Sequence, residues 1–312
     1  MTDLTGRIRR CTGKQPTSFE RVLRGYTPAR RWIVRFEDGT SAFVKEAADA
    51  DTARWLREEV RIYRQLQGDF LPSFLGWDDS EDAPILVLED LSQASWPPPW
   101  NPARVQGVRQ ALEELWAVAA PLGQKRLSEY RDELQGWTKV AADPAPFLSL
   151  GFCSSSWLDA CLPSLLKAEA SAPLDGHSLL HLDVRSDNLC FAGDRAVLVD
   201  WNWAAVGNPD FDLGFWLPSL EAEGGPPPDA ILPNAGPIAG IVSGFFASQA
   251  GLPPIPSAPR VREVQRLQLA TALPWAARAL GLPCGEPHLI LRVAEARGTR
   301  AEQPPETDVS KP

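Results

Sequence analysis

Four polar residues in the second half of the sequence have the types and spacing that phosphoryl transfer requires. The segment His181-Leu-Asp-Val-Arg-Ser-Asp-Asn188 places Asp183 two residues after the histidine and Asn188 five residues after Asp183. An apolar run from Val197 then leads directly into Asp200. Phosphoryl transfer uses one carboxylate to orient and deprotonate the attacking hydroxyl, and oxygen ligands that hold Mg²⁺ between the phosphates. The pattern therefore predicts Asp183 as the base and Asn188 and Asp200 as the metal ligands.

Each of these three residues also has a simpler interpretation. Asp and Asn side chains near a strand end are often solvated or cap a turn. Taken singly, Asp183, Asn188 or Asp200 fits that simpler interpretation better than a catalytic one. Their occurrence together and in this order, with an apolar strand that feeds the second Asp, favours a functional site.

The segments HLDVRSDN and VLVDWNWAAVGNPDFDLGFW resemble the catalytic loop and the metal strand of the aminoglycoside phosphotransferase and choline kinase-like family. That family shares the protein-kinase-like fold. The resemblance implies a kinase that uses ATP and Mg²⁺, with Asp183 as the base and Asn188 and Asp200 as metal ligands. A later G-x-P-x-x-D-L pattern starts at Gly207 and contains Asp212, to which the family gives a structural role.

Two features differ from the usual pattern of kinases. Leu182 stands where the family usually has a glycine after the histidine. The phosphate-covering loop between the first two predicted strands contains only Gly25, whereas protein kinases carry several glycines there. Related kinases tolerate a side chain at the first position, and members of this family often lack the multi-glycine loop. Neither difference removes the prediction of a kinase.

A strand lysine that binds the α- and β-phosphates, held by a helix glutamate, is the second half of such an active site. Lys45 in Phe-Val-Lys-Glu matches the family's V-x-K position, and Glu58 and Glu59 compete as its partner. On a helical wheel Glu59 falls near the middle of the apolar sector, whereas Glu58 lies among polar residues. Because a buried carboxylate is costly unless a cation pairs with it, we expect Glu59 to pair with Lys45. The alternative is a solvated strand lysine and a glutamate at the helix edge.

The adenine-binding hinge is predicted from the resemblance at Leu-Glu-Asp-Leu, which ends the apolar run from Pro84. Main-chain N–H and C=O groups pair with adenine in such a hinge, so the identity of the side chains matters little. The resemblance assigns Glu89 and Leu91 to nucleotide binding.

Hydrophobic patterning predicts a first part of the chain built on an antiparallel sheet. A strand near Phe19–Leu23, a hairpin over Arg30–Ala47 turning at Asp38-Gly39, and a strand over Pro84–Leu91 accompany one helix over Asp51–Gln67, which Asp51 or Thr52 would cap. The prolines of Ser95–Pro102 forbid regular structure and mark a boundary.

The second part is predicted to be mainly helical. Helices are expected over 103–122, 127–140, 157–170, 239–250 and 260–280, two short strands within 179–200, and an exposed loop over 224–237. The expected fold class is therefore α+β, a bilobal protein-kinase-like fold. Residues 1–94 would form a small antiparallel-sheet nucleotide-binding lobe with one helix, 95–301 a larger helical catalytic and substrate-binding lobe, and 302–312 a disordered tail.

The composition of the chain restricts the classes of molecule that it is expected to bind. The 312 residues carry a formal net charge of −9 and a pI near 5.0, which argues against nucleic acid because phosphate backbones are bound through clustered Lys and Arg. The N-terminal segment has no apolar core that could serve as a signal peptide, and no apolar run approaches the length of a membrane span. The five scattered cysteines are interpreted as reduced thiols. We expect a cytoplasmic protein without a membrane partner, and no pattern indicates an oligomeric state.

The sequence therefore predicts an ATP-dependent phosphotransferase whose acceptor is a small-molecule hydroxyl. Asp210, Glu221 and Glu223 would attract an ammonium group if they faced the cleft, which suggests an aminated or cationic acceptor such as an aminoglycoside or amino alcohol; the alternative is solvated loop charges. A catalytically inactive pseudokinase that acts as a partner module is a second reading, opposed by the complete set of site residues. A protein kinase is opposed by the absence of D-F-G and A-P-E segments.

Overall fold

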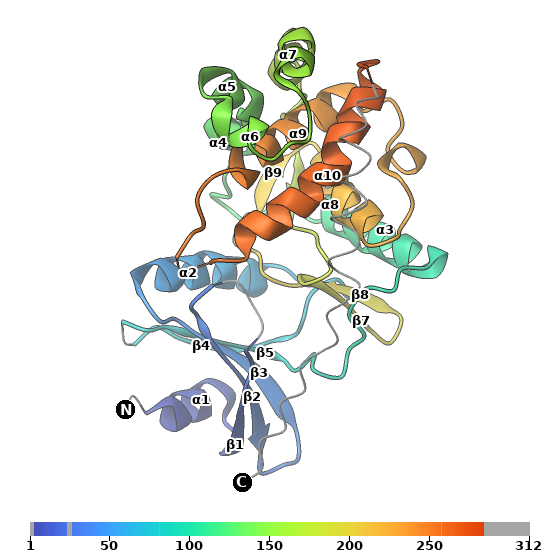
Figure 1. Cartoon of the computed structure of the whole chain (residues 1–312). Coiled ribbons are helices and arrows are strands. Elements are labelled where there is room, and N and C mark those ends of the chain that lie inside the picture. The colour runs from blue at the N-terminus through green and yellow to red at the C-terminus, as the bar shows by residue number, and fades with distance from the viewer. Residues whose placement is uncertain (1–2, 24–26, 81, 257, 284–312) are drawn as a thin grey trace.

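The N-terminal part of the chain is built on a five-stranded antiparallel sheet with strand order β1-β2-β3-β5-β4 (Figure 1). The computed structural model describes residues 3–23, 27–80, 82–256 and 258–283, so that the loop glycine Gly25 and the predicted tail 302–312 lie outside the described residues. The strands are β1 (Pro16–Arg21), β2 (Arg30–Phe36), β3 (Ser41–Glu46), β4 (Phe74–Asp78) and β5 (Ile85–Glu89).

The β2–β3 hairpin forms where the sequence predicts it. Gly39 has a φ of 80°, a value that favours glycine, and the Thr40 N–H donates to the Asp38 carboxylate over 3.0 Å. Helix α2 (Ala50–Gln65) follows β3. Its N-cap is Asp49 rather than the predicted Asp51 or Thr52, because the Asp49 carboxylate and the Thr52 side chain form a reciprocal capping box.

The prediction of one helix in this part of the chain is wrong, because a second helix, α1 (Leu4–Thr12), contacts β4 and packs its Ile8 against buried residues of the sheet. Its sequence is short and rich in arginine, so that it has no apolar periodicity from which a helix could be predicted. The helix is anchored from outside: the fully buried Arg7 donates to the Asp78 carboxylate over 3.0 Å and to the Ala83 carbonyl over 2.9 Å. Tertiary contacts therefore stabilise a segment whose own pattern is polar.

The C-terminal part is mainly helical, and its helices lie together on one side of the sheet part in Figure 1. Its α-helices are α3 (Pro102–Ala117), α4 (Arg131–Leu134), α5 (Gly136–Ala142), α6 (Ala145–Leu148), α7 (Ser155–Ala170), α8 (Asp210–Ala222), α9 (Gly236–Ala250) and α10 (Val261–Ala279), with 3₁₀ turns at Leu127–Tyr130 and Pro228–Ala230. Two small antiparallel ribbons pair β6 (Ser178–Leu180) with β9 (Ala205–Gly207), and β7 (Leu189–Ala192) with β8 (Arg195–Leu198).

Several segments of this part differ from the prediction. The helix expected over 127–140 is divided into a 3₁₀ turn, α4 and α5; the region 179–200 contributes to three strands rather than two; and α6 and β9 were not expected. Helix α8 was missed because ten of its residues are buried, so that its sequence has no polar face and no helical period. The segment expected to be an exposed loop, 224–237, contains a 3₁₀ turn and ends inside α9, and Pro228, Ala235 and Gly236 in it are buried. Burial therefore overrides the local signal of its prolines and glycines.

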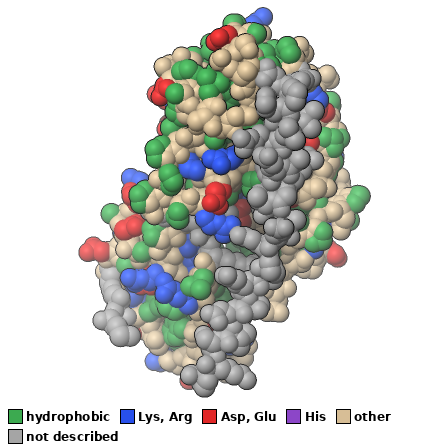
Figure 2. All heavy atoms as spheres, in the orientation of Figure 1, with side chains coloured by type: hydrophobic (Ala, Val, Ile, Leu, Met, Phe, Trp, Pro, Cys, Tyr) green, Lys and Arg blue, Asp and Glu red, His purple; other side chains and the backbone are tan. Residues whose placement is uncertain are grey.

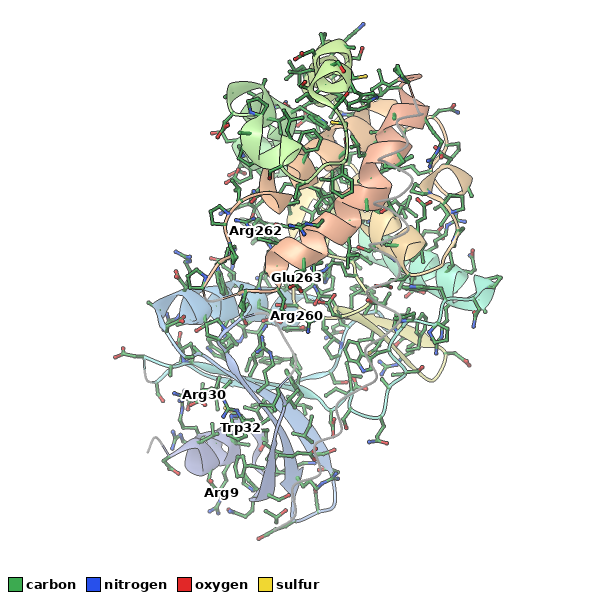
Figure 3. The ribbon with its side chains drawn as sticks, viewed as in Figure 1. Arg9, Arg30, Trp32, Arg260, Arg262 and Glu263 are labelled. Atoms are coloured by element: carbon green, nitrogen blue, oxygen red, sulfur yellow. The ribbon has the colours of Figure 1, made fainter. Side chains whose placement is uncertain are left out.

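A shared apolar core joins the two parts. One cluster of buried residues includes Leu56 of α2, Leu88 of β5, Leu112 of α3 and Leu217 of α8. Within the ranges described above, no helix is both long enough and apolar enough to cross a membrane. At the surface between the two parts, cationic and acidic side chains lie side by side in Figure 2. Arg260 and Glu263 at the start of α10, labelled in Figure 3, form one such pair at 3.9 Å.

The linker after β5 is attached to the second part. Ser95 exchanges two main-chain hydrogen bonds with Phe191 of β7, each 2.9 Å long. Arg195 of β8 forms an ion pair with Glu89 at the end of β5, over 2.8 Å. The predicted hinge is therefore held against the β7–β8 ribbon by both main-chain and side-chain contacts.

Candidate active site

The predicted catalytic loop lies between β6 and β7, and His181 braces it from inside. The ring is fully buried, its Nε2 lies 3.0 Å from the Val199 carbonyl, and the Asp183 N–H donates to its Nδ1 over 3.2 Å. A carbonyl only accepts, so the proton is on Nε2. Burial lowers the pKa of His181 to about 4, so that the ring is neutral at pH 7. The histidine thus ties the loop of Asp183 to the residue before Asp200.

The side chain of Asp212, at the start of α8, binds the main chain of the same loop. Its carboxylate accepts from the N–H of His181 over 2.9 Å, from the N–H of Leu182 over 2.7 Å and from the Trp116 indole over 2.9 Å. Burial raises the pKa of Asp212 to about 6 despite these three donors. Leu182 has a φ of 63°, which explains why related sequences usually carry glycine there.

Asp183 and Asn188, five residues apart in the sequence, are in direct contact. The Asn188 Nδ2 donates to the Asp183 carboxylate over 2.8 Å and to its carbonyl over 3.1 Å. Arg185 contacts the same carboxylate over 3.1 Å. Burial raises the pKa of Asp183 to about 7, against the opposing effect of Arg185, although 27% of the side chain remains exposed. A carboxyl with a pKa near neutral is suited to general base catalysis.

Asp200 lies next to this pair because the strand before it is bonded to the catalytic loop. The Val199 N–H donates to the Asn188 carbonyl over 2.9 Å. Asp200 itself has a φ of 68°, a left-handed conformation that a non-glycine residue rarely adopts. Its Oδ1 accepts from Lys45 over 3.0 Å and from Asn202 over 2.6 Å. Burial alone raises the pKa of Asp200, but the nearby Lys45 amine outweighs this effect and lowers the pKa. The side chain is therefore a carboxylate.

Lys45 joins the sheet part to this site. Its Nζ donates to the Glu59 carboxylate over 2.7 Å, and the Glu59 side chain also accepts from the Tyr63 hydroxyl over 3.4 Å. Only 9% of the Lys45 side chain and 2% of the Glu59 side chain are exposed. Burial alone lowers the pKa of Lys45, but Asp200 and Glu59 outweigh it and raise the pKa, so that the amine stays charged. Glu58, the competing acid, is exposed and pairs with Arg61.

The atoms available at Asn188 and Asp200 suit a hard divalent cation. The Asn188 amide nitrogen is bonded to Asp183, which leaves its Oδ1 as a ligand, and Oδ1 of Asp200 is bonded to Lys45, which leaves Oδ2. Oxygen ligands of this kind fit Mg²⁺, which also retains water and phosphate ligands. Among the residues that the structure describes, no group of three His, Cys, Asp or Glu side chains offers another metal site.

Glu89 and Leu91, the predicted hinge residues, lie at the end of β5 and just beyond it. The Glu89 N–H donates to the Ser73 carbonyl over 2.9 Å, and its carboxylate accepts from the Ser73 N–H over 3.0 Å and from Arg195 over 2.8 Å. The Leu91 carbonyl accepts from the N–H of Ala94 over 3.0 Å. The contacts of Glu89 thus fix the strand end, and a role of Glu89 and Leu91 in nucleotide binding stays a prediction.

Sequence reasoning missed three side chains that support the site: Arg185, Asn202 and Tyr63. Arg185 bridges Asp183 and Asp187, the latter over 3.2 Å. Arg185 and Asn202 lie within two residues of a predicted site residue, which was the available signal. Tyr63 lies one helical turn after Glu59, so that helical spacing alone could have linked the two side chains.

The three acids considered for substrate attraction are not equivalent. Glu223 accepts from the Trp100 indole over 2.8 Å and from the Ser186 hydroxyl over 2.6 Å, so that it holds the catalytic loop in place rather than lying in a solvated loop. Asp210 and Glu221 both belong to α8, where Asp210 occupies the first turn.

The tryptophans near Asp200 also have different environments. Trp201 and Trp216 are 1% exposed and belong to the core, so that neither lines a pocket. Trp203, in contrast, is 47% exposed and packs against Tyr130 with ring centroids 6.0 Å apart.

The chain is similar to several solved structures. The macrolide 2'-phosphotransferase MphH from Brachybacterium faecium has a solved structure with TM-score 0.52 and 18% identity, covering 91% of this chain and 98% of that chain. A macrolide 2'-phosphotransferase type I gives TM-score 0.49, 16% identity and coverage of 95% and 96%. The aminoglycoside phosphotransferase APH(3'')-Id of Streptomyces rimosus, solved with ADP and streptomycin, gives TM-score 0.43, 15% identity and coverage of 95% and 99%. Only the first of these three structures has a TM-score above 0.5, and at 18% identity it shows the fold alone.

The sequence itself gives the family. No curated protein matches it at a significant level. The model of the phosphotransferase enzyme family matches residues 14–237, which include the lysine strand, the catalytic loop and the metal strand. Because this match covers more than half of the chain, the protein belongs to the phosphotransferase enzyme family and is an enzyme that phosphorylates hydroxyl groups.

Proposed function

We propose that the protein transfers the γ-phosphate of ATP to a hydroxyl group of a small molecule, with Asp183 as base and Asn188 and Asp200 as ligands of Mg²⁺. The observation that carries this proposal is the double contact of Lys45. Its amine lies 2.7 Å from Glu59 of α2 and 3.0 Å from Asp200, so that the sheet part and the metal strand meet at one cation. A lysine held in this way beside a metal ligand is placed to bind nucleotide phosphates.

Each side chain has a defined task in the transfer. Asp183 accepts the proton of the acceptor hydroxyl and orients its oxygen toward the phosphorus, while Asn188 and Arg185 hold its carboxylate in place. Lys45 binds phosphate oxygens, and Glu59 keeps its amine at the required position. Bound Mg²⁺ would supply the neutralising charge between the phosphates. The main chain of Glu89 and Leu91 would pair with adenine.

An aminated or cationic acceptor is the substrate class that we propose within this chemistry. The net charge of −9 favours the approach of cations. The exposed face of Trp203, three residues after Asp200, adds an aromatic surface that can stack on a sugar ring or an ammonium group. We do not propose Glu223 as a substrate-binding residue, because its carboxylate already accepts hydrogen bonds from Trp100 and Ser186.

The first experiment tests the reaction with one pair of variants. Asp183→Asn should lower the rate of phosphate transfer by about 10³-fold, in line with the loss of a general base, and leave binding of Mg²⁺-ATP nearly unchanged. Binding is measured by thermal shift, where nucleotide at 100 times its Kd should stabilise the protein by about 2.7 kcal/mol. Asp187→Asn is the matched control, since Asp187 also contacts Arg185 and is 36% exposed. Wild-type turnover by Asp183→Asn would show that the assigned base is wrong.

The second experiment tests the acceptor. The purified enzyme is assayed with ATP and Mg²⁺ against aminoglycosides, macrolides, amino alcohols and neutral sugars. Turnover of aminated compounds supports the proposed class, and turnover of neutral sugars alone contradicts it. Nucleotide binding without transfer to any compound in the panel would instead favour a protein that binds ATP and does not catalyse.

A further inference from the structure

A second cation lies opposite Lys45 in the sheet. Arg31 of β2 is the direct cross-strand partner of Lys45 of β3. Directly opposite residues of an antiparallel pair project from the same face, and neighbours along a strand project from opposite faces. Arg31 therefore shares the Lys45 face. Arg30 and Trp32, labelled in Figure 3, belong to the other face, where Trp32 packs against the cluster that contains Ile8 of α1.

The Arg31 guanidinium is held in position by neutral groups. It donates to the carbonyls of Thr27 and Ala29 over 3.2 and 2.8 Å, and to the Thr27 hydroxyl over 2.6 Å. These bonds occupy three of its five N–H groups, and the remaining two have no partner among the described residues. An arginine with this fixation presents a rigid fork, which is the geometry that phosphate oxygens match.

Among the described residues, the charge of Arg31 also has no carboxylate in direct contact. Lys45 is within 3.0 Å of two carboxylates, whereas no carboxylate within the described ranges lies within ion-pair distance of Arg31. Burial lowers the pKa of Arg31. The charges of Asp200 and Glu59, which do not contact the guanidinium, partly oppose this effect. The charge of a half-buried cation with neutral hydrogen-bond partners is only partly compensated, and an anionic ligand bound beside Lys45 would compensate it.

We propose that Arg31 is a second phosphate-binding residue. Arg31 on β2 and Lys45 on β3 together bind the polyphosphate of the nucleotide. This inference rests on the proposed function, since it requires a nucleoside di- or triphosphate in the site. It adds a residue that no motif in the sequence indicates, because a strand arginine before Trp-Ile-Val reads as a solvated charge. Arg31 touches the ligand and takes no part in proton transfer.

The test compares ligands that differ only in phosphate. Binding of adenosine, AMP and ADP with Mg²⁺ is measured by isothermal titration calorimetry for wild type, Arg31→Gln and Arg31→Lys. A lost charge-assisted hydrogen bond predicts that Arg31→Gln weakens ADP binding by about 10- to 100-fold and leaves adenosine binding unchanged. Arg31→Lys should recover part of the loss. Arg21→Gln is the matched control, because Arg21 is exposed and pairs with Trp32 on the opposite face of the sheet.

The outcomes distinguish the proposed role of Arg31 from the proposed function of the protein. Equal weakening of adenosine and ADP by Arg31→Gln would mean that Arg31 acts through the fold, and this overturns the inference. Unchanged ADP binding in Arg31→Gln also overturns it while the proposed function stands. A wild-type protein that binds neither ADP nor ATP contradicts the proposed function itself. The thermal midpoint of each variant, and its retained adenosine binding, show that the protein is folded.

Discussion

Lys45 is a buried cation that two carboxylates hold from distant parts of the chain. Glu59 reaches it from α2 and Asp200 from the metal strand, 155 residues away. Removing one member of a buried pair leaves the other charge without full compensation, and this costs more than the pair contributes when intact. The position of the lysine amine therefore depends on Glu59 in particular, since we propose Asp200 as a metal ligand as well.

Glu59→Gln should destabilise the protein by about 3–5 kcal/mol and lower kcat/KM for ATP by at least about tenfold, because the Lys45 amine loses its fixed partner. Urea denaturation gives the first quantity and steady-state kinetics the second. Glu58→Gln is the matched control: it is the adjacent acid on the same helix, is exposed, and pairs only with Arg61 at the surface. Equal effects of the two substitutions would contradict the assignment of Glu59.

Leu182 combines a left-handed main chain with a packed side chain. Its φ is 63°, and the side chain packs against the large core of the helical part. Two substitutions separate these effects. Leu182→Ala loses the packing and keeps the unfavourable main-chain conformation, while Leu182→Gly loses the packing and relieves the conformation. We expect Leu182→Gly to be more stable than Leu182→Ala by about 1 kcal/mol, measured by denaturant unfolding. The reverse order would show that the left-handed conformation costs nothing here.

At the scale of elements, α1 depends on a contact with a distant strand. Arg7 is fully buried, and Asp78 at the end of β4 is its ionic partner. Burial alone raises the pKa of Asp78, but hydrogen bonds from Ser80 and the Arg7 guanidinium outweigh it and lower the pKa to about 2. The folded state therefore binds the proton of Asp78 more weakly than the unfolded state does, whose ordinary value is about 3.9.

This depressed pKa predicts a stability that depends on pH. The contribution of Asp78 is fully present above about pH 4 and is lost as the pH falls to about 2, which corresponds to about 2–3 kcal/mol. Urea unfolding of wild type and Asp78→Asn at several pH values measures it. The variant should be less stable near neutral pH and should lose less stability between pH 4 and pH 2. Parallel curves for the two proteins would contradict the assigned pKa.

At the scale of the whole molecule, the two parts of the chain are joined by more than the linker. Leu56 and Leu88 of the sheet part belong to the same buried cluster as Leu112 and Leu217 of the helical part. The Ser95–Phe191 bridge adds main-chain bonds across the junction. The two parts therefore share a packed interface, and neither part buries its own core completely without the other.

We accordingly expect one cooperative unfolding transition. Differential scanning calorimetry should give a single peak whose van 't Hoff enthalpy equals the calorimetric enthalpy. Mg²⁺-ATP should move that whole peak to higher temperature, since the nucleotide would contact both parts of the chain. Two separate peaks, of which only one moves with nucleotide, would show that the sheet part and the helical part unfold independently.

The sequence alone predicted the family and many of the elements. Spacing predicts Asp183, Asn188 and Asp200 as site residues, because a catalytic loop and a metal strand are local units whose residues lie close together in the chain. The helical wheel chose Glu59 over Glu58, since only a paired acid is tolerated in an apolar sector. Elements with clear periods, such as the β2–β3 hairpin and α2, could be predicted because their patterns belong to single segments.

The tertiary structure decided everything that depends on contacts between distant segments. Helix α1 exists because Asp78 compensates Arg7, and α8 has no period because it is buried all around. The left-handed conformation of Leu182 is held by Asp212, thirty residues further along the chain. Arg31 faces Lys45 because of strand register, which a sequence of alternating residues leaves open until the partner strand is known. Local spacing thus predicted the reacting groups, and long-range packing decided which charges surround them.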